Sequence, residues 1–401
     1  MRTKTILFIL ITLLFTACSQ LPEGHHVVIC IPVYGQSLAL GEEAERITDF
    51  DSLANYADGR IVTENLDHDY GYFESNDMKR FAKKMVGYQK RSFELSIYTM
   101  AQRLADHIGK DTLICIFPGG QGATQLSNLS KGTLPYQEFM ENIKTAYKQT
   151  IEKDWDFQIP AVCWMQGESD IEDYPDTEFR QLLLQIWEDM NTDIQQITQC
   201  KDTIRFICYQ TNSLSRAAKY QPDSYDCIET TVPQTFVDML RDDQWFWASG
   251  PTYPYSCVGE KIHIDATGQQ HIGELAARSA LGILRGGERI RGLIPIATSV
   301  KDKEVIVQLN VPSPPLTFDT LQVRKVQNYG FSVISKNNCN IAQSVSIEGN
   351  SVRITCAESP QGCKVRYAVN GDPLKSGNLH GPRGNLRDSS GNWCYLFDQP
   401  L

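Results

Sequence analysis

Between residues 27 and about 285, short apolar runs alternate with longer amphipathic stretches. The runs at 27–33, 112–117, 160–165 and 203–209 are apolar at most positions, which is typical of strands buried on both faces. In the stretches between them, and over 267–284, apolar residues recur at spacings of three and four, which places one apolar stripe on a helix. The pattern predicts an α/β fold, a doubly wound parallel sheet covered by helices on both faces.

Beyond Gly287 the pattern changes. Residues 300–370 contain short alternating segments, "EVIVQLNV", "FSVISK", "SVRITC" and "KVRYAV", separated by Gly, Pro and Asn. Such segments are typical of antiparallel strands joined by tight turns. We therefore expect an α/β domain over 18–288 and a small antiparallel β domain over 289–401.

The first residues have the features of an export signal. Arg2 and Lys4 precede an apolar run over 6–15, which is followed by Thr16, Ala17 and Cys18. The run is shorter than the roughly 20 residues that cross a bilayer. A cysteine directly after small residues resembles the bacterial lipobox, which implies a signal peptide at 1–17 and a lipid on Cys18. The alternative is plain secretion, with Cys18 incidental.

Charge narrows the class of partner. The chain has 38 basic and 48 acidic residues and a net charge of −10, so a nucleic-acid backbone is not attracted to it. A neutral, polar partner fits better, and we expect contact with a membrane only through the lipid.

The twelve cysteines fall into different settings. Four of them lie within the predicted strands, where a free cysteine behaves as a small buried apolar residue: Cys30, Cys115, Cys163 and Cys208. Four others lie in the C-terminal region and are candidates for pairing: Cys339, Cys356, Cys363 and Cys394. Their irregular spacing does not favour a zinc site.

Chemically useful residues follow the predicted strands. In an open α/β sheet, ligands bind outside the carboxyl ends of the strands. Gln36 and Ser37 follow the first strand, "GGQGAT" the second, "QGESD" the third and "QTN" the fourth. Hydroxyl, glycine amides, carboxamide and carboxylates are the groups that a nucleophile and an oxyanion hole require.

A nucleophilic serine needs a base, and His263 is the candidate. It lies in "EKIHIDATG", directly before the last predicted helix, with Glu260 three residues upstream as a candidate to orient it. Ser37 is not in a Gly-x-Ser-x-Gly motif, because position 39 is Ala39, so an α/β-hydrolase elbow is a poor fit. Ser37 has one structural alternative, which is to cap a following helix.

Four segments together resemble the SGNH (GDSL-type) hydrolases, in the branch of the sialate O-acetylesterase-like and acetylxylan esterases. "GQSLALG" resembles the first block, "GGQGATQLSNLSKG" the second, and "WMQGESD" the Gln-Gly-Glu segment typical of this branch. "EKIHIDATG" resembles the last block, Asp-x-x-His. "VRYAVNG" and "GNLRDSSG" resemble the trailing β segment of some members, so the resemblance spans nearly all of the mature chain.

The resemblance implies roles for individual residues. Ser37 is then the nucleophile and His263 the base, while the amide of Gly122 and the side chain of Gln166 line the oxyanion hole, with Gln36 beside them. No metal ion or cofactor is implied. Leu38 stands where the branch usually has Asn, and Glu260 where it has Asp. Some relatives use the Glu of Gln-Gly-Glu as the third member of the triad, so Glu168 is the alternative to Glu260.

The resemblance also implies a substrate, an O-acetylated carbohydrate, and a location on the bacterial cell envelope. The aromatic cluster at 245–255 is a candidate surface for stacking on sugar rings, or else part of the core. Two rival functions remain: a non-catalytic glycan-binding protein on the same fold, and a lipid or thioester hydrolase.

Overall fold

The computed structural model describes residues 26–49, 52–53, 55–63, 65–66, 82–84, 93–171, 176–215 and 230–401. The predicted signal peptide and the lipid on Cys18 lie outside the described residues. Across the described ranges, no helix is both long enough and apolar enough to cross a bilayer.

The α/β part is built on parallel strands in two successive sheets, ordered β3-β6-β1-β8 and β11-β10-β9-β2-β7. The strands are β1 (Val27–Cys30), β2 (Val33–Gly35), β3 (Ile61–Val62), β6 (Thr112–Cys115), β7 (Pro118–Gly120), β8 (Asp156–Gln158), β9 (Ala161–Met165), β10 (Arg205–Gln210) and β11 (Phe246–Pro251). β4 (Asn65–Leu66) and β5 (Ala82–Lys84) form a separate antiparallel pair. The four predicted strands are confirmed, and 27–33 is divided at Pro32, which has no N–H to donate.

The order of the strands explains where a ligand can bind. β2 lies between β7 and β9, so the chain crosses first to one side of β2 and then to the other. A crevice opens at such a switch point, outside the carboxyl ends of the strands. Ser37 follows β2 directly and therefore lies at the switch point.

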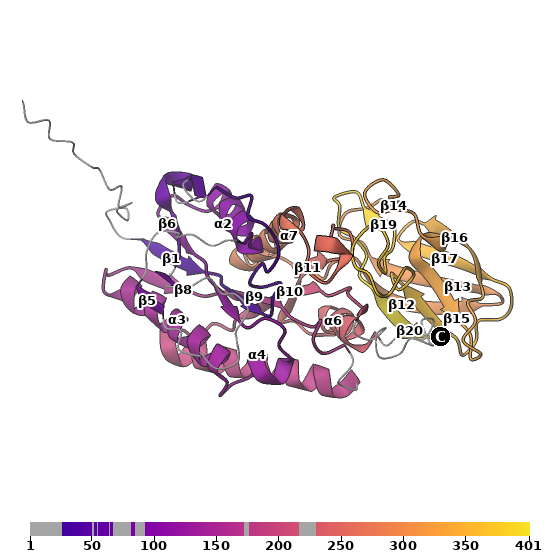
Figure 1. Cartoon of the computed structure of the whole chain (residues 1–401), viewed down its shortest axis with the longest axis horizontal. Helices are drawn as coiled ribbons and strands as arrows, with labels where there is room; N and C mark the ends of the chain where they lie inside the picture. Colours follow the sequence, from indigo (N-terminus) through magenta and orange to yellow (C-terminus); the bar gives the residue numbers. More distant parts are fainter. Residues whose placement is uncertain are drawn as a thin grey trace, which may run out of the picture.

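Helices cover both faces of the sheet, as predicted (Figure 1). α2 (Ser96–His107) and α7 (Ala266–Leu284) lie on one face, and α3 (Leu134–Ile151), α4 (Asp176–Thr198) and α6 (Thr231–Asp242) lie on the other. The Asp265 side chain caps α7 by accepting from the Gly268 amide at 2.8 Å. β11 and α6 were not among the predicted elements.

The aromatic cluster at 245–255 belongs to the core. Trp245 is half-buried and stacks on Trp187, with ring centroids 5.5 Å apart. The other four aromatic residues are buried on β11 or just after it: Phe246, Trp247, Tyr253 and Tyr255. The interpretation of this cluster as an exposed sugar-stacking surface is therefore wrong, because the rings pack inside the fold.

The C-terminal region consists of antiparallel sheets, which confirms the predicted β-rich character. One sheet has the order β12 (Ile294–Lys301), β13 (Glu304–Asn310), β17 (Ser351–Cys356), β16 (Ala342–Glu348). A second has β15 (Phe331–Ile334), β18 (Lys364–Tyr367) and β20 (Phe397–Pro400), and β14 (Leu316–Phe318) pairs with β19 (Leu386–Asp388). Among the described residues, the four C-terminal candidates form no disulfide, while the four strand cysteines are buried as predicted.

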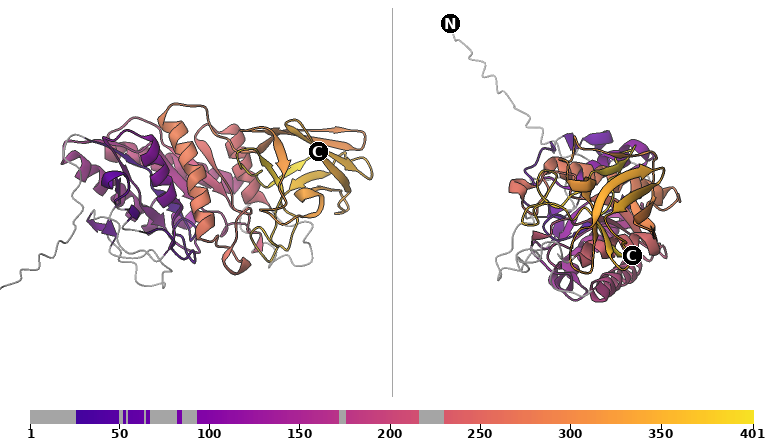
Figure 2. Two further views of the ribbon diagram at one scale, coloured as in Figure 1. Left: turned by 90° about the horizontal axis from the view of Figure 1, so that it is seen from above. Right: turned by 90° about the vertical axis from the view of Figure 1, so that its right-hand side faces the viewer.

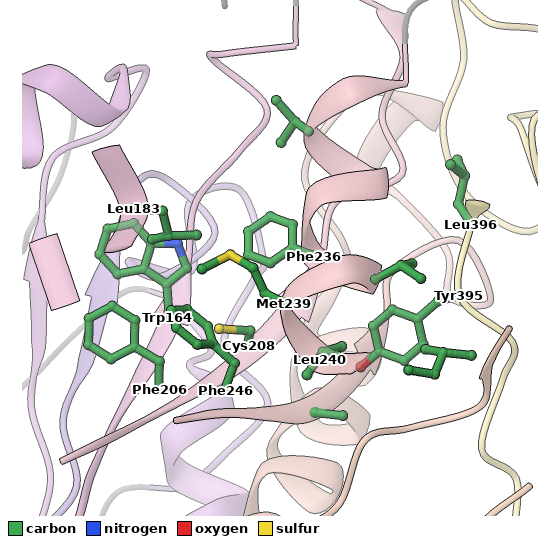
Figure 3. Close-up of a cluster of buried hydrophobic side chains, with 14 of the residues drawn as sticks. Trp164, Leu183, Phe206, Cys208, Phe236, Met239, Leu240, Phe246, Tyr395 and Leu396 are labelled. Atoms are coloured by element: carbon green, nitrogen blue, oxygen red, sulfur yellow. The ribbon is translucent and has the colours of Figure 1, made fainter. Parts of the chain in front are cut away.

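The two parts lie end to end and share buried apolar packing (Figure 2). Figure 3 shows Tyr395, from the last segment of the chain, beside Leu240 of α6, and Leu396 belongs to the same buried cluster. Tyr395 Oη accepts from the Gly250 amide at 2.7 Å. The β region is thus attached to β11, the edge strand of the sheet β11-β10-β9-β2-β7.

A second attachment lies at the carboxyl end of β10. Gln210 Nε2 donates to the Leu396 carbonyl, and the Leu396 amide donates to Gln210 Oε1, both at 2.8 Å. The last segment of the chain therefore fixes a strand end on the rim where the candidate site lies.

Candidate active site

Ser37 lies in a tight turn after β2 and is 4% exposed. Its carbonyl accepts from the Leu40 and Glu42 amides at 3.1 and 3.0 Å. The turn continues to residue 43 without becoming a helix, so Ser37 does not cap one. The structure thus removes the alternative that the sequence left open for this serine.

The glycine-rich loop after β7 packs closely against the Ser37 turn. Gly120 has a φ of +113°, and a side chain there would collide with the Gly35 carbonyl, which accepts from the Gln121 amide at 3.1 Å. A side chain on Gly122 would collide with the Glu42 carboxylate. These contacts place Gly122, the predicted oxyanion amide, beside the turn that carries Ser37.

Gln166 follows β9 and is fully buried. Its Nε2 donates to the Asp170 carboxylate and, at 3.3 Å, to the Thr124 carbonyl. The longer of these two bonds is the weaker one. The role of Gln166 as an oxyanion donor stays a prediction.

Glu168 is buried and bonded on the sheet side of the site. Gln36 Nε2 donates to its Oε2 at 2.7 Å, and the Tyr209 hydroxyl lies 2.6 Å from both of its oxygens. Burial raises the pKa of the Glu168 carboxyl, while the Tyr209 hydrogen bond and the charge of His263 act in the opposite direction. Glu168 therefore holds Gln36, the residue before Ser37, in place.

His263 lies in the loop between η4 (Val258–Glu260) and α7, as predicted. The Val258 amide donates to the His263 carbonyl at 2.8 Å, which fixes the loop. His263 Nδ1 lies 2.7 Å from Glu43 Oε2, a contact that was not predicted. This contact brings the histidine loop to the end of the Ser37 turn.

Glu260 does not pair with His263, contrary to the expectation from their spacing. Its Oε2 accepts from Lys375 Nζ at 2.9 Å, and its Oε1 is hydrogen-bonded to His380 Nδ1. These two bonds lower the pKa of the Glu260 carboxyl. Its backbone has a φ of +56°, and its carboxylate faces the C-terminal region rather than the imidazole.

Glu42, like Glu43, lies at the site and was not predicted from the sequence. Its side chain is buried, and its Oε1 has no hydrogen-bond partner among the described residues. Burial raises the pKa of its carboxyl, His263 lowers it, and Glu43 raises it. The available signal was the pair Glu42-Glu43, two carboxylates five and six residues after the candidate nucleophile.

A pocket of about 430 Å³ borders the Gly122 loop. It is lined by Gln121, Ala123, Thr124, Gln125, Asn128, Thr133, Leu134 and Pro135. A larger groove of about 740 Å³ runs between α3 and α4, and none of the candidate site residues lines it. The smaller pocket is the one next to the candidate chemistry.

Comparisons with known proteins point to the carbohydrate esterases. Residues 84–282 match the family model described as carbohydrate esterase, sialic acid-specific acetylesterase. This segment contains Gly122, Gln166, Glu168 and His263, and Ser37 precedes it. No curated protein matches the sequence.

Several solved structures are similar to this chain at low sequence identity. A carbohydrate acetylesterase from Xanthomonas citri is 14% identical, with a TM-score of 0.64 over 93% of this chain and 80% of that one. A protein from Arabidopsis thaliana is 12% identical, with a TM-score of 0.45 over 65% of this chain and 99% of that one. NanS is 14% identical, with a TM-score of 0.43 over 66% of this chain and all of that one. Over residues 84–282, the chain is therefore similar to the carbohydrate esterases of the sialic acid-specific acetylesterase family.

Proposed function

We propose that this protein removes O-acetyl groups from a carbohydrate, with Ser37 as nucleophile and His263 as general base. One observation carries the proposal: the loop before α7 brings His263 into hydrogen-bond contact with the turn that begins at Ser37. The family match supports the class of substrate.

The reaction runs in two halves. His263 takes the proton of Ser37 Oγ, which attacks the acetyl carbonyl carbon. The bond to the sugar oxygen breaks, and that oxygen leaves with the proton from His263, so Ser37 carries the acetyl group. His263 then takes a proton from water, the hydroxyl attacks the acetyl carbon, and acetate leaves as Ser37 regains its proton.

The negative oxygen of each tetrahedral intermediate needs hydrogen-bond donors. We assign the amides of Ser37 and Gly122 to this role, with Gln166 Nε2 as the third donor. Removal of one such donor costs roughly 10²–10³ in turnover in comparable enzymes. A side chain on Gly122 would collide with Glu42 Oε1, so the Glu42 carboxylate lies close to the second proposed donor.

The polar pocket beside Gly122 is our candidate for holding the sugar. Its side chains include carboxamides and hydroxyls, which bond to sugar hydroxyls. With Cys18 carrying a lipid, we further propose that the enzyme lies on the bacterial envelope, where acetylated glycans are within reach.

Acetate release from acetylated sialic acid, acetylated xylan and other acetylated glycans tests the proposal. We expect release from at least one glycan, with a loss of about 10³-fold or more in Ser37→Ala and His263→Ala. Ser344→Ala, an exposed serine on β16, is the matched control and should behave as wild type.

Two results would contradict the proposal. Wild-type turnover no greater than that of Ser37→Ala, on every glycan and on aryl acetates, would favour a non-catalytic glycan-binding protein. A preference for long acyl esters over acetyl esters would favour a lipid or thioester hydrolase.

A further inference from the structure

We propose that Glu43 is the positioning carboxylate of this site, the residue that holds His263 in the orientation and tautomer of a general base. The inference rests on the proposed function, since it assigns a partner to the proposed base. Neither Glu260 nor Glu168, the two carboxylates that the sequence indicated, has this place in the structure.

The contact has the geometry of a charge-assisted hydrogen bond. Glu43 Oε2 and His263 Nδ1 are 2.7 Å apart, at the short end of the range for a carboxylate and an imidazole N–H. A proton on Nδ1 leaves Nε2 of the neutral ring as an acceptor, which is the state a base needs. The His263 side chain is 18% exposed and that of Glu43 is 48% exposed, so the pair is partly accessible to solvent.

The other carboxylates near the ring have different partners. Glu260 is bonded to Lys375 and His380 of the C-terminal region. Glu168 accepts from Gln36 and Tyr209 on the sheet side, and Glu42 lies against Gly122. Within the described ranges, Glu43 supplies the carboxylate that hydrogen-bonds to the imidazole.

The backbone at Glu43 supports a functional role. Its φ is +62°, in the left-handed region that a non-glycine residue adopts only at an energetic cost. Strain of this kind persists where the surrounding turn enforces it, and here the Ser37 carbonyl and the Gly41 carbonyl accept from Glu42 and Ala44 at 3.0 Å each. The same short turn therefore sets the position of Ser37 and of the carboxylate that orients its base.

This arrangement differs from an acid placed three residues before the histidine. An acid on the histidine loop moves with the histidine, whereas Glu43 belongs to the segment of the nucleophile. The Glu43–His263 bond therefore ties the two catalytic segments together, and its loss would let the histidine loop shift relative to Ser37.

Kinetics on the full-length protein test the assignment. We expect Glu43→Ala and Glu43→Gln to lower kcat by about 10-fold or more with KM changed by less than about twofold, because orientation of the base matters in the transition state and not in substrate binding. Glu43→Asp should recover part of kcat. Glu45→Ala and Glu45→Gln, at an exposed position two residues away, are the matched controls.

Two kinetic results would contradict the role proposed for Glu43. If Ser37→Ala and His263→Ala abolish turnover while Glu43 variants match the Glu45 variants, Glu43 has no positioning role. Loss of kcat in Glu260→Gln together with wild-type kcat in Glu43→Gln would overturn it equally, in favour of Glu260.

A second measurement does not depend on turnover. In ¹⁵N-edited NMR, the Nδ1 proton of His263 should give a downfield signal protected from exchange, present in wild type and Glu45→Ala and absent in Glu43→Ala. A signal that survives in Glu43→Ala contradicts the pairing. A protein without Ser37-dependent turnover would overturn the proposed function, and the imidazole signal would still decide the pairing.

Discussion

Gln36 Nε2 donates to Glu168 Oε2 at 2.7 Å, which joins the residue before the candidate nucleophile to the carboxylate after β9. The contact crosses between two neighbouring parallel strands, since Gly35 on β2 pairs with Met165 on β9. The regular pairing of parallel strands thus brings residues that are far apart in the sequence to the same edge of the sheet. Glu168 acts here as an internal brace for the Ser37 turn.

Glu168→Ala should destabilise the protein by about 1–3 kcal/mol for each buried donor left without an acceptor. Such donors include Gln36 Nε2 and the Tyr209 hydroxyl. Chemical denaturation measures the change in the free energy of unfolding. Tyr209→Phe removes one donor together with its hydrogen bond, so it should destabilise the protein less than Glu168→Ala does. Wild-type stability in Glu168→Ala would show that these bonds do not brace the site.

Gly122→Ala should lower kcat by roughly 10²-fold, because the new methyl group would displace the Glu42 carboxylate or the Gly122 amide that we assign to the oxyanion hole. The collision is with a side chain, so removal of that side chain should relieve it. In a double-mutant cycle, Gly122→Ala should therefore lower kcat by a smaller factor in the Glu42→Ala background than in wild type. Equal costs in the two backgrounds would contradict the contact.

Glu42→Gln should stabilise the protein at neutral pH and have little effect in acid. Burial raises the pKa of the Glu42 carboxyl in the folded state. Below its ordinary value of 4.5 the group is protonated both folded and unfolded, and as the pH rises past that value the folded state loses stability relative to the unfolded chain. Thermal unfolding at several pH values, with Glu45→Gln as control, should show that the stability of Glu42→Gln relative to wild type increases with pH. A gain that is constant across pH would point to packing rather than charge.

Tyr395→Phe should destabilise the protein by about 1–3 kcal/mol, because the buried Gly250 amide then lacks its acceptor. Denaturation monitored by tryptophan fluorescence measures the change. Tyr329→Phe, at a half-buried tyrosine of the same β region, is the control and should have a smaller effect. Equal effects would mean that the hydroxyl of Tyr395 contributes little to the attachment of the β region.

Much of the fold follows from local pattern. Runs such as 160–165 are apolar on both faces, which only a sheet covered on two sides can bury, and the structure has β9 at Ala161–Met165. Composition could not predict the role of the aromatic cluster at 245–255, because a core strand and a sugar-stacking loop can have the same composition. Burial on β11 distinguishes them, and burial depends on the rest of the fold.

The sequence by itself determined the α/β class, the trailing β region and the strand ends on which Ser37, Gly122, Gln166 and Glu168 lie, because periodicity and chain order are local properties. Only the tertiary structure decided which carboxylate meets His263. Glu260 is three residues from it in sequence and Glu43 is far from it, yet the loop turns Glu260 toward Lys375 and brings the imidazole to Glu43. A hydrogen bond requires closeness in space, and sequence spacing predicts that closeness only within a single regular element.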